Sequence, residues 1–172
     1  ARRCRTCSGH PGEVARAAGN WDGVAFLDDA VRGADVAGKC MDYTSLTGEY
    51  PEAVAAFGDN RLRLAWTRRL LDAGYRVPSV VHPTAIVSPS AVLGPGCLVL
   101  HGAIINTNTV LGAACLVNSG ALVDHDNVLE DGVHVNLHAT IKAWCHMEPC
   151  ARTEAATVLY STRRHIDGVE DH

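Results

Sequence analysis

Aliphatic side chains recur at every sixth residue through the C-terminal half of this sequence. They are Val87, Leu93, Val99, Ile105, Leu111, Val117, Val123, Leu129, Val135, Ile141 and Met147. A period of six matches neither the 3.6-residue repeat of an α-helix nor the two-residue alternation of a strand. It is typical of a solenoid whose chain turns a corner every six residues, and it therefore predicts a parallel β-helix.

A second column, made of small side chains, runs four residues behind the aliphatic one. It comprises Ala91, Cys97, Ala103, Thr109, Cys115, Ala121, Ala139, Cys145, Ala151 and Thr157, with Asn127 and Val133 as exceptions. Flat faces that meet in a prism leave tight corners, so we expect large and small side chains to alternate around the interior. Gly, Asn and Asp, which tolerate positive φ, lie between the columns and predict turns. A β-sandwich is the alternative, but its strands do not repeat at a strict six.

The N-terminal part of the chain lacks the six-residue repeat and has the pattern of an αβ subdomain. Helical patterns cover residues 13–18 and 61–73, and strand-like patterns cover residues 21–27, 52–57 and 75–81. Helices and strands in alternation predict a small parallel sheet.

Domain boundaries follow from where the repeat begins and ends. We expect an αβ subdomain over residues 1–80, a β-helix over 81–160 and a C-terminal tail over 161–172. The segment from Ala1 to Cys7 carries three arginines and is not expected to form a buried strand. The first strand of the subdomain is therefore expected to be atypical or missing.

Composition excludes several classes of function. A net charge of −4 over 172 residues gives no basic footprint for nucleic acid. The sequence has no apolar run long enough for a membrane span, and from the polar residues after Ala1-Arg2-Arg3 we expect no signal peptide. The CxxC pair of Cys4 and Cys7 has no second pair at zinc spacing. We therefore expect a cytoplasmic protein without a metal site.

One polar cluster, Asp124-His125-Asp126, interrupts the aliphatic coil. A carboxylate beside an imidazole raises its basicity and fixes its tautomer, which suits a general base near neutral pH. His134 stands nine residues on, at an interior-type position. Earlier turns fill that position with Ile86, Val92, Leu98, Ile104, Val110, Leu116, Leu122 and Val128. His125 and His134 cannot share a corner of one chain, but they could face each other across a subunit interface.

Polar turns of the αβ subdomain form a second candidate site. They are Ser8-Gly9-His10, Asp28-Asp29 and Gly58-Asp59-Asn60. Ligands of parallel sheets bind beyond the carboxyl ends of the strands, where these turns are expected to lie. Ordinary turn chemistry is the alternative explanation, and spacing alone does not decide between the two.

Five short motifs, taken in order, resemble those of one family. They are Ser8-Gly9-His10, Phe26-Leu27-Asp28-Asp29, Gly58-Asp59-Asn60, His82-Pro83-Thr84-Ala85 and Asp124-His125-Asp126. The chain resembles the sialic acid O-acetyltransferases and UDP-4-amino-sugar N-acetyltransferases, a branch of the hexapeptide-repeat acyltransferases. It departs from the pattern of that family at Pro11 and His138, where Gly is common.

The resemblance implies a left-handed β-helix, an exception to the usual handedness of parallel crossovers. It also implies a homotrimer with active sites between subunits, acetyl-CoA as donor, and a nucleotide-linked amino sugar or sialic acid as acceptor. On the matching positions His125 would be the base, with Asp126 raising its basicity and Asp124 assisting. His134 would hydrogen-bond the thioester carbonyl. The nucleotide sugar would be held by Ser8, Gly9, His10, Asp28, Asp29 and Gly58.

Small side chains in the later turns predict the path of the acyl donor. With its thioester near His134, acetyl-CoA would run toward the C-terminal turns, around Ala143 and Ala155. A pantetheine arm can lie against the backbone at such positions. The phosphates would meet Arg152, Arg163 or Arg164, because a guanidinium suits phosphate geometry.

Two other functions stay open. The γ-class carbonic anhydrases share the coil and bind zinc through three histidines at a trimer interface. His101, His125, His134 and His138 invite that comparison, but the spacing of His134 and His138 does not match, and the carboxylates beside His125 suit a base better than a ligand set. A catalytically inactive binding or scaffold protein is the third alternative.

Overall fold

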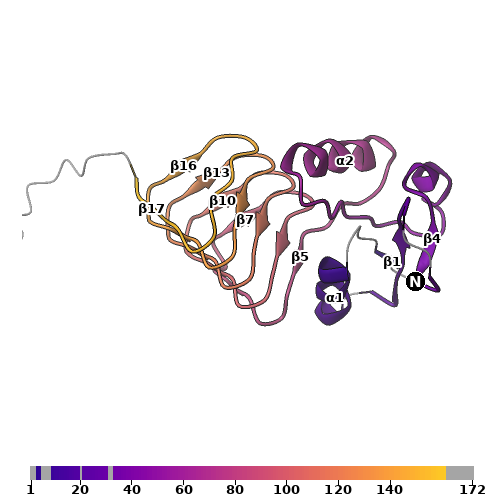
Figure 1. The fold of residues 1–172 in the computed structure, drawn as a ribbon, viewed down its shortest axis with the longest axis horizontal. Helices are drawn as coiled ribbons and strands as arrows, with labels where there is room; N and C mark the ends of the chain where they lie inside the picture. Colours follow the sequence, from indigo (N-terminus) through magenta and orange to yellow (C-terminus); the bar gives the residue numbers. More distant parts are fainter. Residues whose placement is uncertain (1–2, 5–8, 20, 31–32, 162–172) are drawn as a thin grey trace, which may run out of the picture.

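The computed structural model describes residues 3–4, 9–19, 21–30 and 33–161. An αβ unit comes first, and a parallel β-helix follows it from Val80 to the end of the described chain (Figure 1). The β-helix is left-handed, as the resemblance implies. Neither helix in the described part of the chain has the length and apolar character that a membrane span requires.

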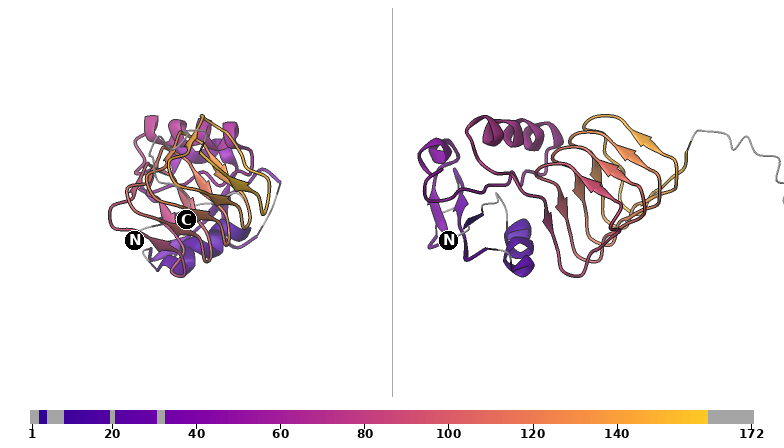
Figure 2. Two further views of the ribbon diagram at one scale, coloured as in Figure 1. Left: turned by 90° about the vertical axis from the view of Figure 1, so that its left-hand side faces the viewer. Right: turned by 180° about the vertical axis from the view of Figure 1, so that it is seen from behind.

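The β-helix has three faces, each built from strands of two residues. The first face holds β5 (Val80–Val81), β8 (Leu98–Val99), β11 (Leu116–Val117) and β14 (His134–Val135). The second holds β6 (Ile86–Val87), β9 (Ile104–Ile105), β12 (Leu122–Val123), β15 (Thr140–Ile141) and β17 (Val158–Leu159). The third holds β7 (Val92–Leu93), β10 (Val110–Leu111), β13 (Val128–Leu129) and β16 (His146–Met147). Paired strands are parallel and 18 residues apart, so one turn takes 18 residues (Figure 2).

Both predicted columns point into the coil. From Val99 to Ile141 every member of the aliphatic column is at most 1% exposed, and from Cys97 to Ala139 every member of the small column is fully buried. Asn127, a polar exception in the small column, is buried as completely as its neighbours. The interior of the coil is therefore the one that the hexad pattern predicts.

The column that contains His134 points outward, so its assignment as an interior-type position was wrong. Adjacent residues of a strand point to opposite sides of a sheet, and the residue before each interior aliphatic must face away from the core. Ile86 and Val92 are accordingly 63% and 56% exposed. On the first face the αβ unit covers this outer surface and buries Leu98 and Leu116.

A left-handed backbone residue recurs at every sixth position, at the corners of the coil. The residues are Gly96, Gly102, Asn108, Ala114, Gly120, Asp126, Gly132, His138, Trp144, Cys150 and Ala156, with φ between 52° and 74°. Glycine adopts this conformation freely, whereas other L-residues pay a steric cost of roughly 1–2 kcal/mol. The repeat therefore imposes strained backbone on Asp126 and Trp144, which share one corner.

The αβ unit is built from short elements. They are β1 (Arg3–Cys4), α1 (Gly9–Ala18), β2 (Gly23–Val24), β3 (Phe26–Leu27), β4 (Val36–Gly38), the 3-10 helix η1 (Cys40–Ser45) and α2 (Asn60–Asp72). The α2 helix matches the predicted one within a residue, because Asp59 caps it and accepts a hydrogen bond from the Leu62 amide at 2.7 Å. The α1 helix starts four residues earlier than predicted, at Gly9.

The sheet of this unit corrects the prediction. Within the part of the unit that the structure describes, two separate parallel pairs, β1 with β2 and β3 with β4, stand in place of one small sheet. A strand-like run over 52–57 forms only a single bridge, from Glu52 to Arg76, and β5 at the end of the 75–81 run belongs to the coil. Strands of two or three residues are too short to show a hydrophobic alternation in the sequence.

Contacts from both α1 and α2 hold the αβ unit against the coil. The α1 helix lies beside β5 (Figure 1). Its Val14 and Ala15 pack with Val80 and Leu98 on the outer side of the first face. Arg63 of α2 is fully buried and binds corner carbonyls of the coil, with Nε 2.8 Å from the Ala114 oxygen and one terminal nitrogen 3.0 Å from the Gly132 oxygen. Burial lowers the pKa of Arg63 from its usual range.

Candidate active site

The corner between the second and third faces carries the Asp124-His125-Asp126 cluster, directly after β12. His125 Nδ1 lies 2.7 Å from Oδ2 of Asp126, and the His125 amide donates to Oδ1 of Asp124 at 2.9 Å. The His125 side chain is 47% exposed. Because Nδ1 is engaged by the carboxylate, Nε2 is the ring atom that can accept a proton from a substrate.

The preceding turn holds both carboxylates in place. Asn106 donates to Asp124 at 3.3 Å, and Asn108 donates to Asp126 at 3.1 Å. The hydrogen bond from His125, followed by that from Asn108, lowers the pKa of Asp126. Burial raises the pKa of Asp124, but the His125 amide and Asn106 outweigh it and lower the pKa overall. Both carboxylates are therefore ionised at neutral pH and stabilise an imidazolium.

Two buried polar side chains support this corner from inside the coil. Thr109 Oγ1 and Asn127 Nδ2 both donate to the Asp124 carbonyl at 2.7 Å, and Asn127 Oδ1 accepts from the Cys145 amide at 2.7 Å. In the sequence, Asn127 stands out only as an exception to the small column. Its position directly after the cluster was the signal that could have identified it as a positioning residue.

The next turn of the coil places Ala143 and Trp144 beside the cluster. Ala143 lies 18 residues after His125, at the same corner. The Trp144 ring is half exposed and meets the His125 ring edge to face, with centroids 6.1 Å apart. Ala155 lies at the corner between the first and second faces. Within one chain, therefore, only Ala143 of the two predicted donor-binding alanines accompanies His125.

His134 lies on a different face from His125, as expected. It is 4% exposed, and its Nε2 lies 3.4 Å from Nδ2 of Asn118. Burial lowers the pKa of His134 to about 4, and the charges of Arg63 and Arg152 add to this shift. His134 is therefore neutral at pH 7, and one chain does not bring it together with His125.

The aspartates of the predicted sugar-binding turns accept hydrogen bonds from backbone amides of the αβ unit. Oδ1 of Asp28 accepts from the Ala30 amide at 2.8 Å, and Oδ1 of Asp29 accepts from the Cys40 amide at 2.9 Å. Gly9 and His10 begin α1, whereas Ser8 lies outside the described residues. These aspartates follow β3 as predicted.

Gly58 is exposed just before the α2 cap. Asn60, from the same motif, has a structural contact, because its Nδ2 donates to the Cys150 carbonyl of the coil at 3.0 Å. Asp59, between them, is the α2 cap. Turn and capping chemistry therefore accounts for two residues of the Gly58-Asp59-Asn60 motif.

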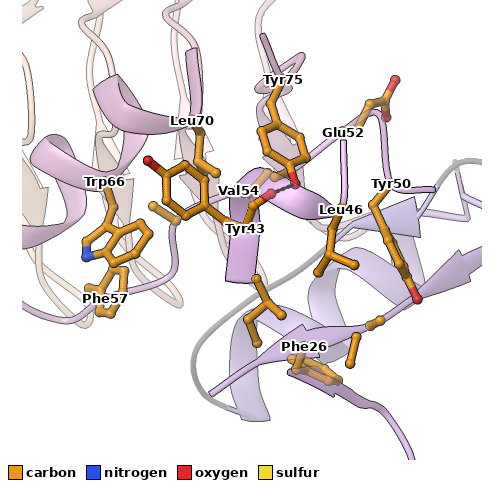
Figure 3. Close-up of a pocket in the computed structure, with 15 residues that line it drawn as sticks. Phe26, Tyr43, Leu46, Tyr50, Glu52, Val54, Phe57, Trp66, Leu70 and Tyr75 are labelled. Atoms are coloured by element: carbon orange, nitrogen blue, oxygen red, sulfur yellow. Dashed lines mark hydrogen bonds between the residues drawn. The ribbon is translucent and has the colours of Figure 1, made fainter. Parts of the chain in front are cut away.

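An aromatic cavity lies inside the αβ unit, between η1, α2 and β3 (Figure 3). Its wall includes Phe26, Tyr43, Tyr50, Phe57, Trp66 and Tyr75. At about 30 Å³ it is large enough for roughly two water molecules and much too small for a nucleobase. The cavity therefore belongs to the core of the unit, and a nucleotide would have to bind on the surrounding loops.

The remaining histidines are dispersed. His101 stacks on His82 with ring centroids 3.8 Å apart, and the His138 ring lies against Gly120 of the preceding turn. These rings occupy the corner between the first and second faces, away from His125. Among the described residues, no three His, Cys, Asp or Glu side chains are grouped as a metal site would require.

Solved structures resemble this chain over nearly its whole length. The acetyltransferase domain of PglB from Neisseria gonorrhoeae, in complex with acetyl coenzyme A, is 30% identical with a TM-score of 0.75, over 93% of this chain and 85% of that one. PerB from Caulobacter crescentus, in complex with CoA and GDP-perosamine, is 29% identical with a TM-score of 0.67, over 94% and 86%. No protein-family model and no curated protein matches the sequence.

Proposed function

This chain belongs to the hexapeptide-repeat acetyltransferases, and we propose that it transfers an acetyl group from acetyl-CoA to an amino group of a nucleotide-linked sugar, with His125 as general base. The observation that carries the role of His125 is its 2.7 Å contact with Asp126 on an exposed corner. The similar structures contain acetyl coenzyme A in one case, and CoA with GDP-perosamine in another. Both ligands fit the proposed reaction.

The proposed reaction needs no covalent enzyme intermediate. The sugar nitrogen attacks the thioester carbon while Nε2 of His125 accepts the proton that the nitrogen loses. Asp126 stabilises the imidazolium that forms. The tetrahedral intermediate then collapses, the carbon–sulfur bond breaks, and the proton returns to the departing CoA sulfur. The products are the N-acetylated sugar and free CoA.

We place the reaction between subunits of a homotrimer. The second face exposes apolar side chains, with Ile86 63% and Val158 44% exposed, and a second copy would bury them. This face is bordered by the corner that carries His125 and by the corner that follows His134. In the proposed trimer, the second faces of the three copies would pack around one axis. The corner that carries His125 in each copy would then lie beside the corner that follows His134 in the next copy, and this would bring His125 close to the His134 of a neighbour.

The bound molecules are assigned to the two sides of this shared site. Acetyl-CoA would place its carbonyl near His134 and its pantetheine arm along Ala143 of one copy and Ala155 of the other. The nucleotide sugar would bind on loops of the αβ unit, at Ser8, Gly9, His10, Asp28, Asp29 and Gly58. Both alanines lie on outer corners and are small, which supports this path.

Replacement of His125 tests the mechanism. His125→Ala should lower the turnover of acetyl-CoA with GDP-perosamine by about 10²–10⁴-fold, measured as thiol release, because a general base contributes that much. His146→Ala is the matched control, since His146 is similarly exposed and lies 3.0 Å from Glu130 and 3.5 Å from Glu148. Its turnover should stay within about threefold of the native value. Comparable losses in both variants, or none in either, would overturn the role of His125.

Mixed trimers test the shared site. Equal amounts of His125→Ala and His134→Gln chains, unfolded and refolded together, should recover turnover, because some interfaces then combine a native His125 with a native His134. Each variant refolded alone should stay inactive. Absence of recovery, with trimers confirmed by sedimentation, would place the whole site within one chain.

A further inference from the structure

We propose that Asn118 is a positioning residue, which fixes the tautomer of His134 so that His134 presents its Nδ1–H to the carbonyl of the acyl donor. The inference rests on the proposed acetyl transfer and deepens it. The two residues are neighbours on the first face, where Asn118 follows β11 and His134 begins the next strand along, β14.

The orientation of the Asn118 amide is set by its own turn. Oδ1 accepts a hydrogen bond from the Ser119 amide at 2.8 Å, so the carboxamide oxygen faces the backbone. The nitrogen of the same amide must then point the other way, toward Nε2 of His134 at 3.4 Å. An amide nitrogen can only donate, and Nε2 must therefore be the acceptor.

A histidine whose Nε2 accepts a hydrogen bond carries its proton on Nδ1 when it is neutral. Burial, together with Arg63 and Arg152, favours that neutral form. Nδ1 has no hydrogen-bond partner among the described residues, and it is buried in the single chain, so the acyl donor reaches it only when the side chains around it move aside. A buried donor without a partner is costly, and such groups in native proteins call for a ligand or a water molecule.

The two histidines of the proposed site are therefore prepared for opposite tasks. His125 directs Nδ1 at Asp126 and offers the lone pair of Nε2, as a base must. His134 has its Nε2 occupied by Asn118 and offers an N–H. A donor directed at the thioester oxygen stabilises the negative charge that develops there when the amine attacks.

Asn118→Asp tests the inference by reversing the hydrogen bond. An aspartate at this position accepts a hydrogen bond from Nε2–H of His134. The proton of the neutral ring then lies on Nε2, and Nδ1 directs a lone pair toward the reacting oxygen. We expect turnover to fall about 10–100-fold while the KM for acetyl-CoA changes less than threefold. Asn118→Leu removes the donor without adding charge, and should give a smaller loss in the same direction.

The tautomer is read directly by ¹⁵N NMR of histidine-labelled trimer without ligands at pH 7. We expect His134 to be protonated on Nδ1 in the native protein and on Nε2 in Asn118→Asp. Asn136→Ala is the matched control, because Asn136 makes the same turn bond one coil later, from the Leu137 amide at 2.9 Å. It should leave the His134 signals unchanged.

The outcomes separate this inference from the proposed function. A native His134 protonated on Nε2 overturns the assignment, whatever the activity of the enzyme. A switched tautomer with native turnover shows that His134 does not donate to the reacting group. Loss of turnover in His125→Ala, with either of those results, leaves the acetyl transfer standing and removes only the role of Asn118.

Discussion

The coil and the αβ unit position their polar groups in different ways. In the coil, side chains bond to the turn above or below, at a spacing of 18 residues. Such pairs are Ser79–Cys97, Thr84–Gly102, Ser90–Asn108, Asn106–Asp124, Asn108–Asp126, Ala113–Asp131 and Asn127–Cys145. In the αβ unit, Asp28 and Asp59 bond to amides two and three residues away. In the coil, the 18-residue repeat thus allows neighbouring residues to be identified from the sequence. In the αβ unit, neighbouring residues can be identified only from the structure.

This difference decides how each half of the site is built. The carboxylates beside His125 are held by asparagines one turn earlier, so the stacking of the coil fixes the position of the cluster. Asp28 and Asp59 shape their own turns, whereas Asp29 bonds to the Cys40 amide further along the chain, and any sugar-binding role would be added to these structural ones. His134 is buried on the first face of the coil, near the charge of Arg63 from α2.

Acid should therefore destabilise the folded protein through His134. Its pKa is lowered to about 4 by burial, Arg63 and Arg152, whereas an unfolded histidine titrates near 6.5. Because the folded state disfavours the proton, the stability is complete above about pH 6.5 and is lost as the pH falls toward 4. The loss can reach roughly 3 kcal/mol. Denaturant unfolding between pH 7 and 4.5 measures it.

The control for this prediction is His134→Gln, which fills similar space and does not titrate. Its unfolding free energy should vary less over the same pH window. The lowered pKa values of Asp124 and Asp126 act in more acidic solution, as the pH falls below about 4, so they do not confuse the comparison. Parallel pH profiles for the two proteins would mean that burial does not lower the pKa of His134 in solution.

The interior support of the coil gives the next largest effect. Asn127→Ala leaves the Cys145 amide without its acceptor and takes one of two donors from the Asp124 carbonyl, all inside the core. We expect a loss of about 2–3 kcal/mol in unfolding free energy and a fall in turnover. Thr109→Val removes only the other donor and should cost about 1 kcal/mol. Equal costs for the two variants would contradict the ranking.

Much of the coil could be predicted, because each interior position repeats many times. Asn127 was visible as an exception, yet its function depends on the Cys145 amide one turn away, which the hexad pattern alone does not emphasise. The side of the sheet that carries His134 was misjudged for a different reason. Aliphatic residues fill both sides of the first face, since α1 covers the outer one, and composition there does not distinguish inside from outside.

The αβ unit was predicted less well because its elements are short. The α2 helix is long, amphipathic and capped by Asp59, and its range was correct within a residue. η1 and β4 were missed, since six and three residues carry no usable period. Glu52 illustrates the difficulty, because it is buried in an extended run and its carboxylate binds Trp21 at 2.5 Å and Arg76 at 2.9 Å, contacts between segments far apart in sequence.

Two glycines one turn apart test how tightly the coil is stacked. Gly102 and Gly120 have nearly the same φ, +63° and +67°, but a Cβ on Gly102 meets nothing within 4 Å, whereas one on Gly120 lies 2.4 Å from the His138 ring. Gly102→Ala should cost about 1 kcal/mol for its backbone alone. Gly120→Ala should cost about 1–2 kcal/mol more from overpacking. Adding His138→Ala should remove that excess, and failure to do so would show that His138 lies elsewhere.

The smallest predicted effect is that of an alanine-to-glycine substitution, which should raise the free energy of unfolding in the coil and lower it in the αβ unit. Ala156 is exposed at a left-handed corner of the coil, with φ 55°, and Ala17 is exposed within α1. Ala156→Gly relieves the steric cost of that conformation but increases the entropy of the unfolded chain, for a net gain of about 0.5 kcal/mol. Ala17→Gly has no strain to relieve and should lose about 1 kcal/mol, as glycine does in helices. Chemical denaturation of the two variants compares them directly. A loss at both positions would mean that the corner tolerates alanine without strain, and that the repeat does not impose the backbone cost inferred for Asp126 and Trp144.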